Sequence, residues 1–184
     1  PRLLVYSTLA FWLIEDGLSI KDVGLFAATA TPYAIKFLWA PAVDALRLGP
    51  LTTRLGQRRA WMLVSQLGVA LSLGALALTN PAEDALQTAL AALVVAAFSA
   101  TQDIVIDAYR VDLLHIDEQG AGAAAAVFGY RIAMLVAGAG ALYIAALSGD
   151  DWRLTYLVMA CFMGVGVVAT LLAPEPERER SETG

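Results

Sequence analysis

The chain has 184 residues, of which 59% are hydrophobic and only 16% are charged, against about a quarter charged in an ordinary soluble domain. These proportions and a mean hydropathy of +0.66 exclude a soluble globular domain and indicate a protein of the lipid bilayer. The net charge of −5 and the scattered basic residues exclude a nucleic-acid-binding stripe, and the single cysteine, Cys161, excludes an intramolecular disulfide.

Six membrane-spanning helices are predicted, in chain order at about 1–15, 22–43, 60–79, 86–110, 121–147 and 152–173. Charge-free runs support them, since residues 60–82 and 154–174 approach or exceed the ~20 residues that cross a ~30 Å hydrocarbon core. The charge-free runs at 85–102 and 132–149 are slightly shorter. The first helix is too short to span the bilayer and the chain begins at Pro1, so we expect a fragment with a truncated first helix.

The segments that connect these helices predict which helix ends face the cell interior. If the first helix runs outward, seven basic residues lie on the inner side and two on the outer side, which is the asymmetry that sets orientation. The inner set is Arg47, Arg54, Arg58, Arg59, Arg110, Arg178 and Arg180, and the outer set is Lys21 and Arg153. Residues 174–184 are expected to form a cytoplasmic linker or tail.

Four ionisable residues fall at membrane depth, where a charge costs at least ~2.5 kcal/mol on insertion scales. Lys36 is predicted ~12 Å from the inner end of its helix, and Arg131 ~15 Å into its own. Asp103 and Asp107 are four residues apart in "SATQDIVIDAYR" and therefore share one helix face. We expect the four to face a common interior, either as a substrate or proton pathway or as a structural ion-pair cluster, and the sequence leaves both open.

Five segments, in this order, resemble the muropeptide permease AmpG family of the major facilitator superfamily: "YAIKFLWAPAVDAL", "GQRRAWMLVSQ", "SATQDIVIDAYRVDLL", "GAGAAAAVFGYRIAMLVAG" and "ATLLAPEPE". The resemblance extends from the end of the first helix to the end of the sixth. It implies an all-α, polytopic membrane protein in which residues 1–173 are the six-helix N-terminal half of a transporter.

The resemblance also implies an activity. Members of that family import anhydro-muropeptides, which are products of cell-wall turnover, across the bacterial inner membrane with the proton gradient. The implied partners are an anhydro-muropeptide, protons, the lipid bilayer and a missing C-terminal six-helix half. No cofactor, metal or nucleic acid is implied.

Carried over residue by residue, the resemblance implies a substrate or proton pathway formed by Lys36, Gln102, Asp103, Asp107, Tyr130 and Arg131. These residues stand where the family has "FKFLW", "QDIVFDAW" and "GYR". It also implies a cytoplasmic gating loop that contains Asp44, Gly56, Arg58 and Arg59. The loop signature is stretched here, and Ala40 stands four residues before Asp44 in place of its first glycine.

Two alternatives stay open. An acetyl-CoA transporter-like permease shares segments such as "KFLWAP" and "TQDIVID", although Arg131 of "GYR" favours the muropeptide branch. A membrane sensor or assembly subunit that transports nothing is the alternative from another class. An enzyme is not expected, because the sequence has no phosphate-binding glycine loop, no metal-spaced histidine or cysteine cluster and no nucleophile motif.

Overall fold

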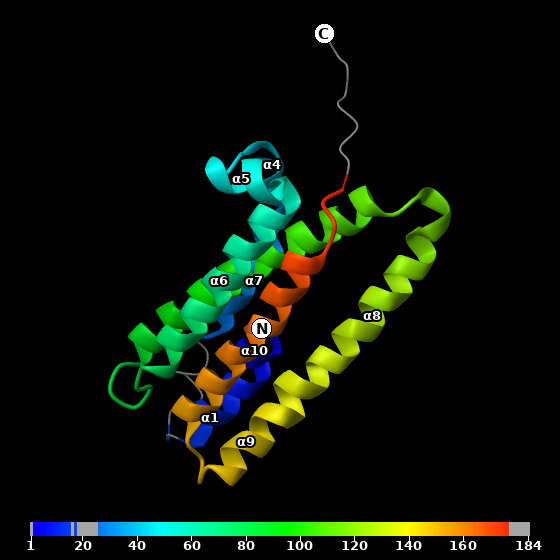
Figure 1. Ribbon diagram of the computed structural model, residues 1–184. Helices are drawn as coiled ribbons and strands as arrows, with labels where there is room; N and C mark the ends of the chain where they lie inside the picture. Colours follow the sequence, from blue (N-terminus) through cyan, green and yellow to red (C-terminus); the bar gives the residue numbers. More distant parts are fainter. Residues whose placement is uncertain (1, 16, 18–25, 177–184) are drawn as a thin grey trace.

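The computed structural model of the chain describes residues 2–15, 17 and 26–176, and every regular element in these ranges is helical (Figure 1). The all-α membrane fold expected from the sequence is therefore confirmed. Lys21, Arg178 and Arg180, which entered the orientation count, lie outside the described residues, as does the start of the predicted span at 22–43.

Four helices within the described ranges are long and apolar enough to cross a bilayer: α6 (Gln57–Ala77), α7 (Ala85–Leu113), a composite helix (Ile116–Leu147) and α10 (Trp152–Leu172). The composite helix consists of η4 (Ile116–Glu118), α8 (Gln119–Leu135), η5 (Val136–Gly140) and α9 (Ala141–Leu147). Because α7 has 29 residues, its length of about 44 Å exceeds the ~30 Å hydrocarbon core, so part of it extends beyond the core.

The first two predicted spans consist of shorter segments. The first contains η1 (Leu4–Thr8) and α1 (Leu9–Glu15). The second is a succession of η2 (Phe26–Ala30), α3 (Thr31–Ile35), η3 (Lys36–Leu38) and α4 (Ala40–Ala45), after which comes α5 (Pro50–Leu55). Pro32 and Pro41 lie in the first turns of α3 and α4, and proline has no N–H to continue a preceding helix. The single helix expected at 22–43 is therefore interrupted in its described part.

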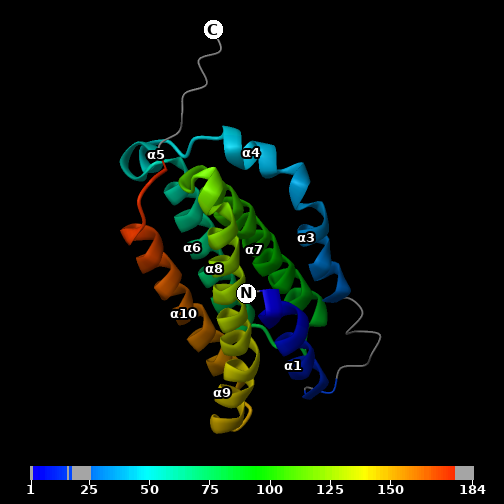
Figure 2. The same cartoon turned by 90° about the vertical axis from the view of Figure 1, so that its right-hand side faces the viewer.

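Helix α6 packs against both α7 and α10, and Figure 2 shows it between them. The core that these helices share with α1 contains Leu9, Leu13, Val69, Leu73, Leu76, Val95 and Tyr156. The Tyr156 hydroxyl donates a 2.7 Å hydrogen bond to the carbonyl oxygen of Leu4, and its ring lies 5.3 Å from that of Trp12. Packing and this buried hydrogen bond together join the N-terminal segment to α10.

Helix α8 lies largely outside this bundle. None of its residues is buried, and in Figure 1 it runs apart from α7 and α10 between its two ends. It is nevertheless rich in alanine, glycine and large apolar residues, so it presents an apolar surface that the described residues leave uncovered.

The two ends of the bundle differ in arginine content, since five described arginines lie at one end and one, Arg153, at the other. We call the end that holds α4, α5 and the last turn of α10 the basic end; its cations are Arg47, Arg54, Arg58, Arg59 and Arg110. The opposite, acidic end contains Glu15, Glu83, Asp84, Asp150 and Asp151. Asp84 and Asp151 begin α7 and α10 as N-caps, each accepting a 2.9 Å hydrogen bond from a backbone N–H of the first turn.

Candidate functional site

A cavity of about 450 Å³ lies between η3, α7 and α8, and it collects most of the residues predicted to form the pathway. It is lined by Lys36, Asp103, Ile106, Asp107, Ala126, Val127, Gly129, Tyr130 and Ala133. The two aspartates come from one face of α7, because they are one helical turn apart, and Tyr130 faces them from α8. One lysine and two aspartates thus share one cavity within the spanning segment.

The charges in this cavity are not closely paired. Among the described residues, no ion pair within 4.0 Å joins Lys36 to either aspartate. Asp107 instead approaches Arg110 on the same helix, at 3.7 Å and with 62% of its side chain exposed. Such an exposed pair contributes little, about 0–1 kcal/mol. The arrangement leaves Lys36 and Asp103 available to other groups.

Gln102 and Arg131, the other two predicted pathway residues, do not line the cavity. Arg131 is exposed on α8. Gln102 is partly buried on α7, and within the described part of the chain its Oε1 atom and the Nε atom of Arg110 are buried without a hydrogen-bond partner. Buried polar atoms normally have partners, so these two belong to a polar surface that the described residues leave incomplete.

At the basic end, Arg58 joins two helices through its side chain. Its guanidinium forms an ion pair with Asp44 of α4, and its Nε donates a 2.7 Å hydrogen bond to Asp112 near the end of α7. Arg58 is only 7% exposed, so its charge depends on these two carboxylates. Asp44 and Arg58, two of the residues expected to form a gating loop, therefore meet in space, together with Asp112, which the sequence did not lead us to expect.

A second set of contacts at this end involves the start of α6. Gly56 is its N-cap with φ of 87°, a conformation suited to glycine, and the backbone N–H groups two and three residues later donate to the Glu175 carboxylate. These hydrogen bonds, from Arg58 and Arg59, measure 2.9 and 3.1 Å. An anion at a helix N-terminus is stabilised by the unpaired N–H groups and the helix dipole. A Cβ atom at Gly56 would collide with the Glu175 side chain.

Arg59 connects the end of α10 to the start of α6 through two hydrogen bonds. Its Nε and Nη2 donate to the carbonyl oxygens of Thr170 and Leu171, at 3.0 and 2.6 Å. The Tyr109 hydroxyl of α7 donates at 2.7 Å to the carbonyl oxygen of Pro174. The basic-end cluster, which we define as Asp44, Arg58, Arg59, Asp112 and Glu175, thus links α4, α6, α7 and the segment after α10.

Two members of this cluster, Asp112 and Glu175, were not predicted, because each lies outside the expected gating loop that runs from Asp44 to Arg59. A signal for Asp112 is present in the sequence, since it lies on the inner end of a helix opposite two adjacent arginines. Glu175 directly follows the apolar run of the last predicted span. It is therefore expected at the same membrane surface as Gly56, the N-cap of α6. Both could have been found by pairing the arginines at one membrane surface with the carboxylates predicted at the same surface.

The comparisons with known proteins agree with this architecture. Residues 3–184 match the family described as Major Facilitator Superfamily. The chain is 39% identical over 176 residues to the anhydromuropeptide permease of Escherichia coli (strain K12), which covers 96% of this chain and 35% of that protein. It is 36% identical over 182 residues to a Rickettsia conorii protein named AmpG 4, covering 99% of this chain and 44% of the relative.

An uncharacterised protein of Haemophilus influenzae is 40% identical over 184 residues, which is all of this chain and 42% of the relative. The chain therefore spans less than half the length of these relatives. The resemblance to permeases inferred from the five sequence segments is confirmed at the level of relatives and superfamily. With its apolar helices and a match over residues 3–184, this multi-pass membrane chain belongs to the Major Facilitator Superfamily of transporters.

Proposed function

We propose that the chain is the N-terminal half of a proton-coupled permease that imports anhydro-muropeptides across the bacterial inner membrane. The observation that carries the proposal is the cavity of about 450 Å³ that holds Lys36, Asp103 and Asp107 within the spanning segment. Ionisable groups at such depth are costly and typically mark substrate or ion pathways. The substrate class follows from the similarity to a permease of that name.

The lining of the cavity suits a carboxylate-bearing glycopeptide. The Lys36 ammonium can bind a carboxylate, the Tyr130 hydroxyl can donate or accept a hydrogen bond, and Ile106 with Val127 provide an apolar wall. In this superfamily the substrate lies near the membrane midplane between two repeats or halves, so one half provides one wall of the site. The exposed positions of Arg131 and of most of α8 are consistent with a face that meets another part of a longer protein.

The aspartates provide the proposed route for protons. Asp103 has no ion pair with a described residue and faces the same cavity as Lys36, so its protonation can respond to substrate or to the opening of the cavity. The basic end is proposed to face the cytoplasm, following the distribution of arginines. Residues 174–184 are proposed to begin the connection to the second half.

Uptake by vesicles that contain the complete protein tests the proposal. Labelled anhydro-muropeptide should accumulate when a proton gradient is imposed, and labelled acetyl-CoA should not. Asp103→Asn should abolish gradient-driven uptake, whereas Asp117→Asn, which changes an exposed carboxylate in η4, should leave it unchanged.

The double variant Asp103→Asn with Lys36→Met distinguishes a pathway residue from a structural counter-ion. It removes one charge of each sign from the cavity, so membrane insertion and thermal stability should be close to those of the unmodified protein. Stability without uptake excludes a purely structural ion pair; because Lys36→Met also removes the proposed ligand of the substrate carboxylate, the single variant Asp103→Asn reports on the proton route. Recovery of both stability and uptake would show that Asp103 only balances Lys36, and would refute the proposal.

A further inference from the structure

The short segment η3 and its C-cap Trp39 contact α7 on two of its sides. Lys36, the first residue of η3, lines the cavity of about 450 Å³ together with Asp103 of α7. Three residues later, the Nε1 atom of Trp39 donates a 3.2 Å hydrogen bond to the hydroxyl of Thr101, which is also on α7. Thr101 and Asp103 are two residues apart, so their side chains leave α7 in directions that differ by about 200°. Lys36 and Trp39 therefore reach opposite faces of the same helix.

The backbone of this segment is held less firmly than that of a continuous α-helix. η3 is a 3-10 helix between α3 and α4, and each of these neighbours has a proline in its first turn. The Trp39 N–H donates to the carbonyl oxygen of Lys36 at 3.3 Å, where an α-helix would use the carbonyl four residues earlier. Hydrogen bonds that span three residues have poorer geometry than those of an α-helix. Side-chain contacts with α7 consequently contribute more to fixing the segment.

Packing alone does not fix the indole ring of Trp39. On one side the ring packs against a small apolar cluster that contains Val43. On another side it borders a hollow of about 290 Å³, together with Ala97, Phe98 and Thr101. A side chain beside open space lacks packing partners in that direction. The hydrogen bond to Thr101 therefore sets the direction of the ring.

We propose that Trp39 is a positioning residue of the substrate pathway, because its hydrogen bond to Thr101 holds η3 on α7 and thereby keeps the Lys36 ammonium in the cavity beside Asp103. This inference rests on the proposed function, in which Lys36 binds the substrate carboxylate. Neither Trp39 nor Thr101 lines the pathway cavity, so both act through Lys36.

Chemical labelling of Lys36 tests the positioning in the absence of substrate. The rate at which an amine-acylating reagent modifies Lys36 in the complete protein is measured by peptide mass spectrometry. Thr101→Val removes the acceptor and should raise this rate about threefold, because the partly buried ammonium becomes more accessible when η3 detaches. A factor of three corresponds to the ~0.6 kcal/mol of an average hydrogen bond between membrane helices. Trp39→Phe should have the same effect, the double variant should add little to either, and Thr101→Ser, which keeps the hydroxyl, should not differ from the unmodified protein.

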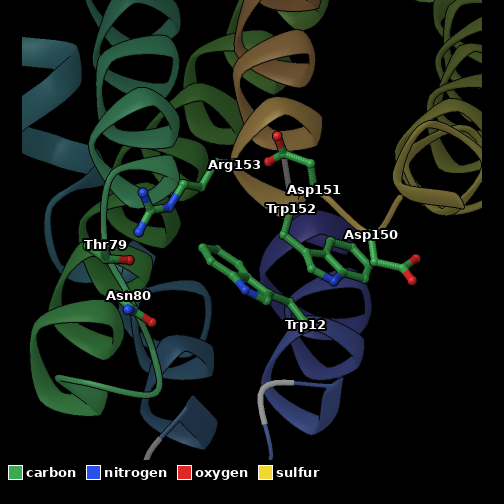
Figure 3. A pocket seen from close by; sticks show the side chains of 7 residues that line it. All are labelled: Trp12, Thr79, Asn80, Asp150, Asp151, Trp152 and Arg153. Atoms are coloured by element: carbon green, nitrogen blue, oxygen red, sulfur yellow. The ribbon is translucent and has the colours of Figure 1, made fainter. Parts of the chain in front are cut away.

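Two matched controls separate positioning from a general loss of stability. Thr88 and Thr101 both lie on α7 and donate to the carbonyl oxygen four residues earlier, but Thr88 accepts no side-chain hydrogen bond from a described residue. Trp152 donates a 2.6 Å hydrogen bond from Nε1 to Glu15, and Figure 3 shows its ring beside that of Trp12, at the acidic end. Thr88→Val and Trp152→Phe each lose a bond of the same kind, and Trp152→Phe should lower the Tm. Neither should change the labelling of Lys36.

Uptake by vesicles distinguishes this inference from the proposed function. Trp39→Phe and Thr101→Val should raise the KM for labelled anhydro-muropeptide about threefold and leave kcat nearly unchanged, because they weaken binding and leave Asp103 in place. The positioning role is overturned if Lys36 labelling is unchanged in both variants, if the two controls raise it equally, or if labelling changes while KM does not. If labelling responds as expected but the unmodified protein takes up no anhydro-muropeptide, the proposed function fails and the positioning of Lys36 by Trp39 is supported.

Discussion

The carboxylate of Glu175 is expected to hold the start of α6, and its removal gives a measurable loss of stability. Glu175→Gln keeps one acceptor oxygen but replaces the other with an NH₂ group that faces a backbone N–H. Glu175 accepts bonds of 2.9 and 3.1 Å from Arg58 and Arg59, and hydrogen bonds to charged groups contribute about 1.5–3 kcal/mol each. Because Glu175 is only partly buried, we expect a net loss of about 1–2 kcal/mol.

The assay is thermal unfolding of the complete protein in detergent. For a domain of this size, 1 kcal/mol corresponds to about 2–4 °C, so the Tm should fall by roughly 2–8 °C. Glu83→Gln is the matched control, because Glu83 is exposed at the opposite end and should leave the Tm unchanged.

A double-mutant cycle with Gly56 isolates the contact. Gly56→Ala places a Cβ atom against the Glu175 side chain and puts alanine at φ 87° and ψ 167°, a conformation that costs about 1–3 kcal/mol without glycine. Since the alanine already displaces the carboxylate, adding Glu175→Gln should lower the Tm little further. Strictly additive losses, or a Tm of Glu175→Gln equal to that of Glu83→Gln, would refute the capping role.

Three further outcomes are expected. Arg58→Met leaves two carboxylates at the basic end without their cation, and we predict a loss of about 2–4 kcal/mol in a thermal or denaturant titration, whereas Arg54→Met, an exposed change on α5, should cost less than about 0.5 kcal/mol. Single cysteines placed at Asp84 and Asp150 should react with an impermeant thiol reagent from the periplasmic side, and one at Arg54 only from the cytoplasmic side; the reverse pattern means that the orientation is inverted. The isolated 184-residue chain should show no proton-driven uptake of anhydro-muropeptide, because it provides one wall of the cavity, and measurable uptake by a monomer contradicts this prediction.

The sequence predicted the long helices well because their charge-free runs approach the thickness of a bilayer. Helices α6 and α10 begin and end within a few residues of the predicted spans. The interruption between Ile35 and Ala40 could not be read from hydropathy, because every residue in it except Lys36 is apolar. Its cause is local, since Pro41 removes a backbone donor just where the next helix starts.

Sequence spacing also placed the two aspartates of the cavity on one face of α7, since helical periodicity is a local property. Which residues of other helices meet that face depends on packing. Lys36 and Tyr130 reach the cavity, whereas Arg131, one residue further along α8, is turned away from it by the ~100° rotation per helical residue. The contact between Glu175 and the start of α6 depends on how α10 packs against α6. Residue spacing along the sequence does not determine this packing.

The contact between Asp44 and Arg58 joins the two ends of the segment that connects α4 to α6. Gln57 and Trp61 reinforce this closure, since their side chains donate to the carbonyl oxygens of Asp44 and Leu46, at 2.6 and 2.9 Å. The length of the chain between these anchor points, which includes α5, consequently has little effect on the contact. Each doubling of the length of a closed loop adds only about 0.6 kcal/mol to the free energy of closing it. This is why a loop signature can be stretched here and still bring its aspartate and arginine together. We accordingly expect the segment 47–55 to tolerate insertions, epitope tags or fluorescent labels.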